Sequence, residues 1–267
     1  MMPTMLLNFV YPPPPSLFLA ATSVISFTAL SFSGISEVSD KHLQYSKFWN
    51  ANPPPRANPI RLSGRTGMLL LYAPALAAAV ASFAVPGVVT TTRSQLLSLA
   101  LSLHFFKRVF EVLFIHQFSG QMVLDSAILI SSSYFIGTVS MIYAQYLTQG
   151  ISEPAINLEY AGVVLFLVGI MGNFYHHFLL SKLRVKGDKG YKIPKRGLFN
   201  LVICPHYLFE IVDFVGVSLI SPTVFSWSFT FGTFFYLMGR SYATRKWYLS
   251  KFPNFPKNVK SLIPYIF

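Results

Sequence analysis

Side chains that could take part in chemistry are concentrated between residues 172 and 210, where two apolar stretches meet a basic segment. The first stretch ends with Asn173, His176 and His177, and the second carries His206 and Glu210. The segment between them has one acid, Asp188, and seven basic residues: Lys182, Arg184, Lys186, Lys189, Lys192, Lys195 and Arg196. Titratable groups are costly within apolar sequence, so their concentration here favours a ligand site.

The spacing of these residues places them on common helix faces. Asn173, His177 and Arg184 are separated by four and then seven residues, which brings all three to one side of a helix. A single polar residue at such a position is explained by a hydrogen bond between helices. Three polar residues on one face, next to the basic segment, favour a ligand site.

The second apolar stretch has the same property. His206, Glu210 and Asp213 share one helix face, and Pro205 is expected to kink or open that helix. Buried carboxylates need partners, and the basic segment supplies candidates. A third stretch carries His104, Lys107, Arg108 and Glu111, for which two interpretations stay open. The four residues form either a self-contained network that includes a Lys107–Glu111 pair, or a part of the site.

The basic segment suits phosphate groups, because glycines at 187 and 190 let the backbone approach a ligand and the lysines supply charge. The alternative is that the segment only fixes membrane topology or contacts anionic lipid. Neither a GxGxxG nor a Walker A sequence is present, which argues against a Rossmann-type nucleotide site. No metal site is expected, since His176 and His177 have no nearby carboxylate or cysteine in the sequence.

The composition is that of a membrane protein. Of 267 residues, 53% are hydrophobic and only 11% are charged, with a mean hydropathy of +0.51. Soluble domains carry about 25% charged residues. The net charge of +12 fits basic cytosolic loops better than a nucleic-acid partner, so the bilayer is the expected partner. The single cysteine, Cys204, excludes an internal disulfide.

The apolar pattern predicts an all-α, polytopic membrane protein with about seven transmembrane helices in a single domain over residues 1–267. The expected spans are 16–35, 66–89, 95–118, 125–147, 160–180, 197–220 and 223–242. The loops after the first and fifth spans, together with the C-terminal tail, hold most of the basic residues. This asymmetry puts the C-terminus in the cytosol and the N-terminus in the lumen.

Several motifs give the chain a resemblance to the steroid 5α-reductase family of membrane reductases, which includes trans-2-enoyl-CoA reductases and polyprenol reductases. The resemblance covers most of the chain and is strongest over residues 173–267. The motifs that carry it are Asn173…Arg184…Gly190-Tyr191-Lys192-Ile193-Pro194, Gly197-Leu198-Phe199, Cys204-Pro205-His206-Tyr207 with Glu210, Arg240 with Tyr248, Phe255-Pro256-Lys257, Leu262-Ile263-Pro264-Tyr265-Ile266-Phe267, and upstream Tyr45-Ser46-Lys47 and His104-Phe105-Phe106-Lys107-Arg108.

The resemblance implies a multi-pass enzyme of the endoplasmic reticulum membrane that takes NADPH from the cytosol. It further implies reduction of a conjugated carbon–carbon double bond in a hydrophobic small molecule. The residues expected to bind NADPH are Lys47, Arg108, Asn173, His177, Arg184, Tyr191, His206, Glu210, Arg240 and Tyr248. The sequence departs from animal steroid reductases, which carry aspartate at the position of His177 and asparagine at that of His206.

Two further departures concern the substrate. Steroid reductases hold the substrate carbonyl with a glutamate and a tyrosine, which align with Tyr72 and Phe105. Tyr72 is therefore the expected proton donor to the carbonyl oxygen, with His104 as the second catalytic candidate, and Tyr72 and Phe105 are the expected substrate contacts. Without the alignment, Tyr72 would be read as a packing residue.

The expected reaction is 5α-reduction of a 3-oxo-Δ4-steroid, and the alternative within the family is reduction of a trans-2-enoyl-CoA or a polyprenol. Outside this class, a non-enzymatic membrane scaffold and a membrane methyltransferase remain.

Overall fold

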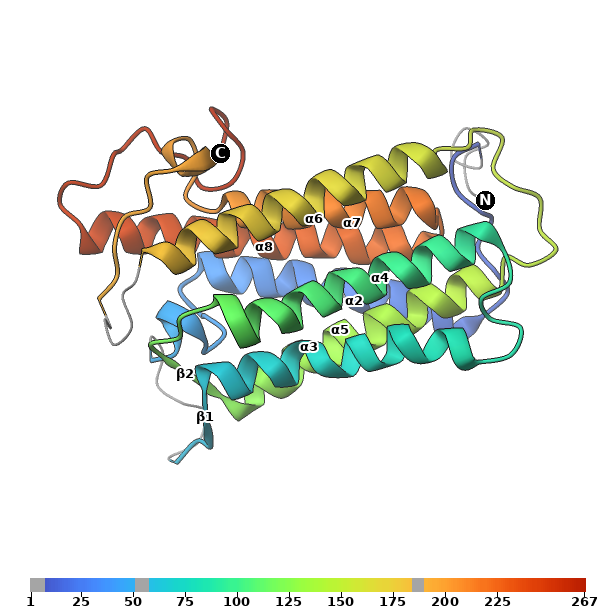
Figure 1. The fold of residues 1–267 in the computed structure, drawn as a ribbon, viewed down its shortest axis with the longest axis horizontal. Coiled ribbons are helices and arrows are strands. Elements are labelled where there is room, and N and C mark those ends of the chain that lie inside the picture. Colours follow the sequence, from blue (N-terminus) through green and yellow to red (C-terminus); the bar gives the residue numbers. More distant parts are fainter. Residues whose placement is uncertain (1–7, 51–57, 184–189) are drawn as a thin grey trace.

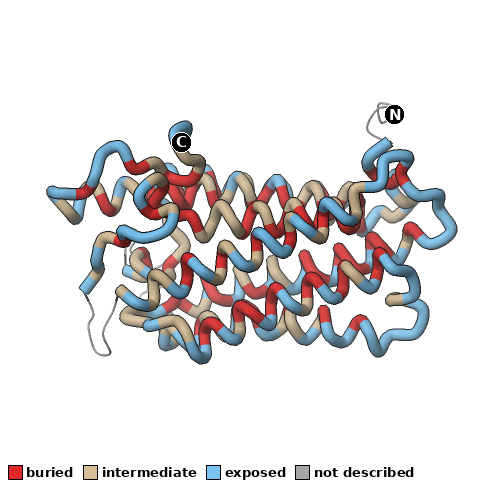
Figure 2. Tube along the Cα trace, turned by 45° about the horizontal axis from the view of Figure 1, so that its top comes forward, coloured by how far each residue is buried: buried red, intermediate tan, exposed pale blue. Residues whose placement is uncertain are grey.

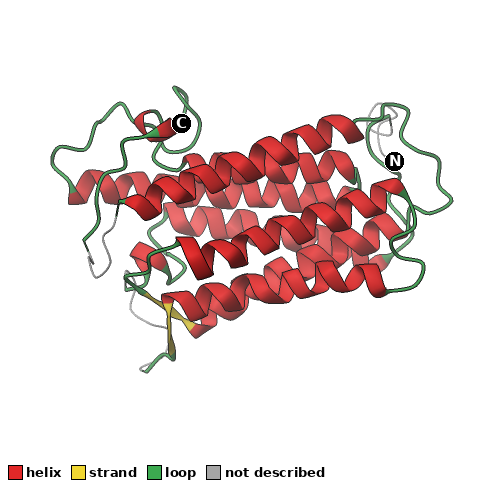
Figure 3. Ribbon diagram, in the orientation of Figure 1, coloured by secondary structure: helices red, strands yellow, loops and turns green. Residues whose placement is uncertain are grey.

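The computed structural model describes residues 8–50, 58–183 and 190–267. Within them the chain folds into seven α-helices and one small two-stranded sheet (Figure 1 and Figure 3). The helices are α2 (Leu17–Val38), α3 (Gly64–Ala81), α4 (Thr92–Phe110), α5 (Leu124–Tyr146), α6 (Glu159–Lys182), α7 (Pro205–Ile220) and α8 (Val224–Lys251). The expected all-α class is confirmed apart from the antiparallel pair β1 (Arg61–Ser63) and β2 (Gln121–Val123).

Four helices, α2, α3, α5 and α6, are long and apolar enough to cross a membrane. The other three helices do not meet this criterion of length and hydropathy. Helix α4 carries buried basic residues, α7 has only 16 residues, and Arg240 breaks the apolar run of the continuous helix α8. Large apolar side chains on α2 face outward, among them Val24, Phe32 and Ile35, which are 63–67% exposed. Exposed apolar helix faces are the expected surface toward lipid.

The helices run side by side, with buried residues on the faces turned toward one another (Figure 2). The closest pairs are α6 with α7, α2 with α8, and α3 with α5. At the first contact, a Cβ on Gly169 would lie 2.4 Å from the backbone nitrogen of Asp213. Glycine is therefore required for α6 and α7 to approach closely, as in other membrane helix pairs. This approach brings Asn173 and His177 beside the start of α7.

Most expected spans match a helix to within a few residues, but the sixth is corrected. Residues Gly197–Asn200 form a 3-10 turn, and α7 begins at Pro205. The expected kink at Pro205 is wrong, because proline lacks an N–H and suits the first position of a helix. The third span also differs, since α4 ends at Phe110 and a π-helical turn, Glu111–Ile115, follows. Helix α8 continues to Lys251, well beyond the expected end of the seventh span.

Candidate functional site

A cavity of about 270 Å³ lies at the end of the bundle where α6 ends and α7 begins. Its described wall draws on every long helix except α2, and on the loop that follows α2. The two apolar stretches singled out in the sequence therefore do meet at one pocket. Eight of the predicted residues line it: Lys47, Tyr72, Arg108, His177, Tyr191, His206, Glu210 and Tyr248.

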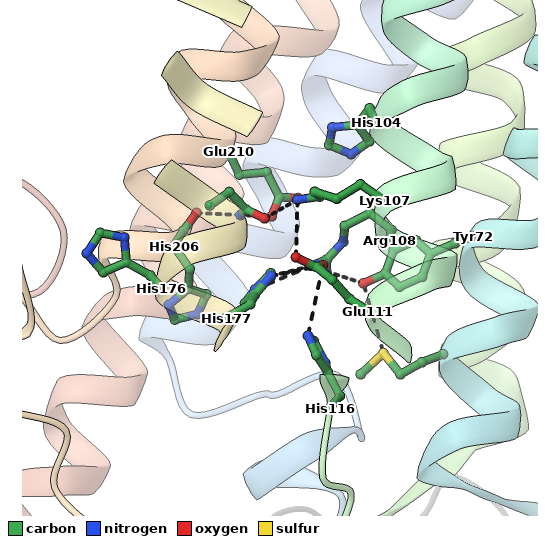
Figure 4. Close-up of polar contacts among 12 residues, drawn as sticks. Tyr72, His104, Lys107, Arg108, Glu111, His116, His176, His177, His206 and Glu210 are labelled. Carbon is green, nitrogen blue, oxygen red and sulfur yellow. Dashed lines mark hydrogen bonds and ion pairs between the residues drawn. The ribbon is translucent and has the colours of Figure 1, made fainter. Parts of the chain in front are cut away.

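Arg108, at the C-terminal end of α4, is the centre of the polar wall (Figure 4). Its Nη2 donates to the Tyr72 hydroxyl oxygen, and its guanidinium lies 4.5 Å from the centre of the Tyr72 ring. Its Nη1 donates to Glu111 Oε2 at 3.1 Å. The Nε atom is buried and makes no hydrogen bond among the described residues. The Arg108 side chain thus links Tyr72 on α3 to Glu111, which directly follows α4.

His177 lies between Glu111 and Arg108. Its Nδ1 lies 3.0 Å from Glu111 Oε2, and Arg108 Nη1 lies 3.1 Å from Nδ1 and 3.3 Å from Nε2. A carboxylate only accepts and a guanidinium only donates. A proton on Nδ1 can be donated to Glu111, while Arg108 Nη1 lies beside both ring nitrogens. His177 is therefore held between an acid and a base.

The π turn Glu111–Ile115 positions Glu111 and the residue that follows the turn, His116, in a way that the sequence did not predict. The His116 N–H donates to the Glu111 carbonyl oxygen at 2.7 Å, which closes a five-residue turn. Burial, reinforced by the positive charge of Arg108, lowers the pKa of His116 to about 4. The expectation that His177 has no carboxylate nearby is wrong, because Glu111 Oε2 lies 3.0 Å from its Nδ1.

Asn173 and Lys107 form the layer behind the cavity wall. Lys107 Nζ donates to Asn173 Oδ1 and lies 3.7 Å from Glu111 Oε1. The expected Lys107–Glu111 pair is thus present. Asn173 Nδ2 donates to the His206 carbonyl oxygen at 2.7 Å and to Glu210 Oε2 at 3.5 Å. Asn173 therefore fixes Glu210 and the start of α7 relative to α4.

Four predicted residues do not belong to the described lining. Asn173 lies in the layer just described. His104 Nδ1 forms a buried hydrogen bond with Asp213 Oδ2, so it does not join the Lys107–Glu111 network. Phe105 is 1% exposed and packs its ring 5.5 Å from that of Tyr134, which does line the cavity.

Arg240, the fourth, holds the loop after α2 in place. Its Nη1 donates to Glu37 Oε1 at 2.6 Å, and the guanidinium lies 4.1 Å from the centre of the Tyr45 ring. Tyr45 in turn lines the cavity. Arg184, also predicted to bind the cofactor, falls outside the described residues.

The cavity wall also contains four tyrosines that were not predicted as site residues, although two of them belong to the family motifs. Tyr45, Tyr134, Tyr207 and Tyr236 line it together, and the hydroxyls of Tyr45 and Tyr236 are 2.8 Å apart. Tyr134 follows three serines within an otherwise apolar span, which is a signal that could have identified it. Cys204 is buried in the same wall, and burial raises the pKa of its thiol to about 11, so it stays protonated.

This arrangement can polarise a ligand oxygen. The Tyr72 oxygen accepts from Arg108, so the phenolic hydrogen is directed elsewhere. Its only acceptor among the described residues is the thioether of Met68 at 4.0 Å, and sulfur is a weak acceptor. The hydroxyl therefore has a hydrogen available to an oxygen in the cavity.

Comparison with known proteins gives a consistent result. The family model for 3-oxo-5-alpha-steroid 4-dehydrogenase matches residues 121–267, which is more than half of the chain. A 3-oxo-5-alpha-steroid 4-dehydrogenase 1 of Macaca fascicularis is 38% identical over 47% of this chain and 46% of its own. A steroid 5-alpha-reductase of Gossypium hirsutum is 44% identical over 40% of this chain and 42% of its own.

Other similar proteins carry names that specify a different substrate, an enoyl-CoA. A very-long-chain enoyl-CoA reductase of Dictyostelium discoideum is 31% identical over 62% of this chain and 55% of its own. The matches thus span about half the length of these curated relatives. On the strength of the family match, the chain belongs to the 3-oxo-5-alpha-steroid 4-dehydrogenase family.

Proposed function

We propose that the chain is an NADPH-dependent reductase of a carbon–carbon double bond conjugated to a carbonyl in a hydrophobic lipid, and that the lipid is a 3-oxo-Δ4-steroid. Family membership and the membrane helices support the reaction class. The proposed setting is a seven-span protein of the endoplasmic reticulum membrane, with its basic end and C-terminus in the cytosol. The substrate then enters from the bilayer and the cofactor from the cytosol.

The residues present fit the chemical groups of NADPH. Lys47 and Lys192 line the cavity and carry the charge that phosphates need, and Arg184 is proposed to add to it. Tyr191 and Tyr248 offer aromatic surface for a planar ring. A carboxamide both donates and accepts, which suits the Glu210 carboxylate and the buried Nδ1 of His206, an atom that makes no hydrogen bond among the described residues. When bound, NADPH supplies the hydride.

Tyr72 is proposed as the acid that assists this reaction. The observation that carries the proposal is the Arg108–Tyr72 hydrogen bond, which leaves the phenolic hydrogen to point at a substrate carbonyl. Negative charge builds on that oxygen as the β-carbon is reduced, so a donor placed there lowers the barrier. The Arg108 guanidinium stabilises the charge that the Tyr72 oxygen gains as it gives up its proton. His104 is the weaker candidate, because its Nδ1 is held by Asp213.

The substitution Tyr72→Phe tests this role, since it removes only the hydroxyl. We expect kcat for enone reduction to fall by about 10²–10³-fold, with the KM for NADPH unchanged. The measurement is NADPH oxidation by the purified protein with a 3-oxo-Δ4-steroid, with product identified by mass spectrometry. Tyr143→Phe, at a partly exposed position of α5, is the matched control. Full activity of Tyr72→Phe would remove this residue from the mechanism.

The second candidate function is reduction of a trans-2-enoyl-CoA, which the similarity to very-long-chain enoyl-CoA reductases favours. The same assay separates the two when it is run with a panel of enone steroids, trans-2-enoyl-CoAs and polyprenols. Turnover of an enoyl-CoA without turnover of any steroid would replace the first candidate with the second. A failure to oxidise NADPH with any of the three classes would contradict both.

A further inference from the structure

The π turn after α4 brings three metal-ligating side chains together at the edge of the cavity. An α-helix would place residues five apart on different faces, whereas the π turn sets His116 over Glu111. Both side chains then point toward His177 on α6 (Figure 4). Short π-helical segments are frequent at functional sites, so this interruption of α4 is a reason to look at what it positions.

The geometry of the three side chains suits one metal ion. Their nearest ligand atoms all lie within 4.8 Å of one another. His177 Nδ1 is 3.0 Å, and His116 Nε2 is 3.9 Å, from Glu111 Oε2. Zinc bonds of about 2.0–2.2 Å to nitrogen and oxygen place tetrahedral ligands about 3.3–3.6 Å apart, so only small shifts are required. Two imidazoles and a carboxylate form a common three-residue ligand set for Zn²⁺, with the fourth position open.

A second observation points to a ligand here. Glu111 is fully buried, and its Oε1 makes no hydrogen bond among the described residues. The same holds for His116 Nε2. Lys107 Nζ lies 3.7 Å from Glu111 Oε1, too far for a hydrogen bond, and most buried polar atoms in proteins are hydrogen-bonded, so the two atoms need an explanation. His116 also lines the cavity, which gives an ion a path to the cluster.

The guanidinium of Arg108 already places a positive charge within this cluster. Arg108 Nη1 lies 3.1 Å from Glu111 Oε2 and 3.1 Å from His177 Nδ1, which is where a metal ion would sit. Among the described residues, Lys107 and Arg108 already interact with the carboxylates of Glu111 and Glu210, and Lys107 also interacts with Asp213. A divalent ion added to this balance requires the guanidinium to withdraw into the cavity that it lines.

We propose that Glu111, His116 and His177 form a site for a divalent transition-metal ion of the Zn²⁺ class, and that the ion displaces Arg108 from Tyr72 and so inhibits the reductase. The binding half of this proposal stands on the geometry alone, and the inhibition half rests on the proposed function. It departs from the expectation of no metal drawn from the sequence, where Glu111 and His116 are far from His177.

Metal binding is tested on the full chain, purified without a polyhistidine tag and stripped with a chelator. Titration with Co²⁺ is expected to give the visible absorption of a four-coordinate ion, saturating at one Co²⁺ per chain and abolished by Zn²⁺. His116→Ala and Glu111→Gln are expected to lose this absorption. His176→Gln is the matched control, because His176 turns away to the Gly172 carbonyl oxygen. No absorption in the wild-type chain, or an unchanged spectrum in His116→Ala, would overturn the site.

Inhibition is tested separately, with each variant compared to its own metal-free rate. Zn²⁺ is expected to inhibit NADPH oxidation by the wild-type chain, and His116→Ala to need at least a tenfold higher concentration for half-inhibition. Equal sensitivity of the two proteins would overturn the proposed displacement of Arg108. If the chain proves to have no reductase activity, the Co²⁺ spectrum still decides whether the metal site exists.

Discussion

Two buried arginines on one helix have opposite surroundings. Arg93 lies in the first turn of α4 and Arg108 in the last, and they are 2% and 8% exposed. Arg93 bonds Glu153, Asn157 and the carbonyl oxygen of Ile220, the last at 2.6 Å. It thereby ties α4 to the loop before α6 and to the end of α7. None of these three partner residues lines the cavity.

Arg108, in contrast, sits in a network that is incomplete. It contacts Tyr72, Glu111 and His177, all of which lie at or beside the cavity, and its Nε has no hydrogen bond among the described residues. A complete network fixes a fold, whereas an incomplete one leaves hydrogen-bonding capacity for a ligand. The two ends of α4 therefore differ in role although they use the same side chain.

The largest expected effect is the loss of activity in Arg108→Met, which keeps much of the apolar stem and removes the charge. We expect kcat for enone reduction to fall by about 10²–10³-fold, because Tyr72 loses the group that stabilises its developing charge. Steady-state assays of the purified protein measure this. Because Glu111 would lose one of its two cationic partners and keep only Lys107, the variant is also made in combination with Glu111→Gln. Activity within a few-fold of wild type in both proteins would show that Arg108 is only structural.

Arg93→Met should show the reverse pattern. Removing this side chain takes a donor from the carbonyl oxygens of Leu219 and Ile220 and leaves the half-exposed Glu153 without its cation, so the free energy of unfolding should fall by about 2–3 kcal/mol. Thermal unfolding in detergent measures the change, and kcat of the folded fraction should stay near that of the wild type. A large loss of kcat in Arg93→Met at unchanged thermal stability would erase the distinction between the two ends of α4.

The helices were largely predictable from the sequence, because apolar runs of about 20 residues have few alternatives in a bilayer. The failures lie where backbone chemistry overrides hydropathy. Apolar residues between Gly197 and Cys204 suggested helix, yet this segment forms a 3-10 turn and Pro205 starts α7. The π turn after Phe110 has no signal in the apolar pattern at all, so the convergence of Glu111 and His116 on His177 could not be foreseen.

The site was predictable where its residues come from one helix and not where they come from distant segments. His177, His206 and Glu210, which helix spacing groups by face, all line the cavity, and their part in binding stays a prediction. Helix spacing could not show that Arg240 would be held by Glu37, a partner 203 residues away, rather than line the described cavity. It also missed Tyr134, whose part in the wall depends on how α5 packs against α3.

A smaller effect is expected for Tyr11→Phe, which tests the periphery of the Arg93 network. Tyr11 is 3% exposed, hydrogen-bonds Glu153, and its ring centre lies 5.9 Å from the Arg93 guanidinium. Loss of one such hydrogen bond should lower the free energy of unfolding by about 1 kcal/mol. Thermal unfolding at neutral pH measures it. Any change in reductase activity of the folded protein would contradict the separation of the two arginine networks.

The smallest expected effect is the part of the pH dependence that Glu153 contributes at the Arg93 end. Burial disfavours the charged form of Glu153, but hydrogen bonds from Arg93 and Tyr11 and the charge of Arg93 outweigh it and hold its pKa below the usual value. A depressed folded-state pKa means that the stabilisation is complete above the unfolded pKa of about 4.3 and is lost as the pH falls below it. Thermal unfolding measured from pH 6 to pH 3 should therefore show a loss that is smaller in Glu153→Gln than in the wild type. Because the Glu153 side chain is 55% exposed, solvent screens the interaction and the loss should be small. An identical pH profile in Glu153→Gln would mean that Glu153 contributes nothing to the stability at this end of α4.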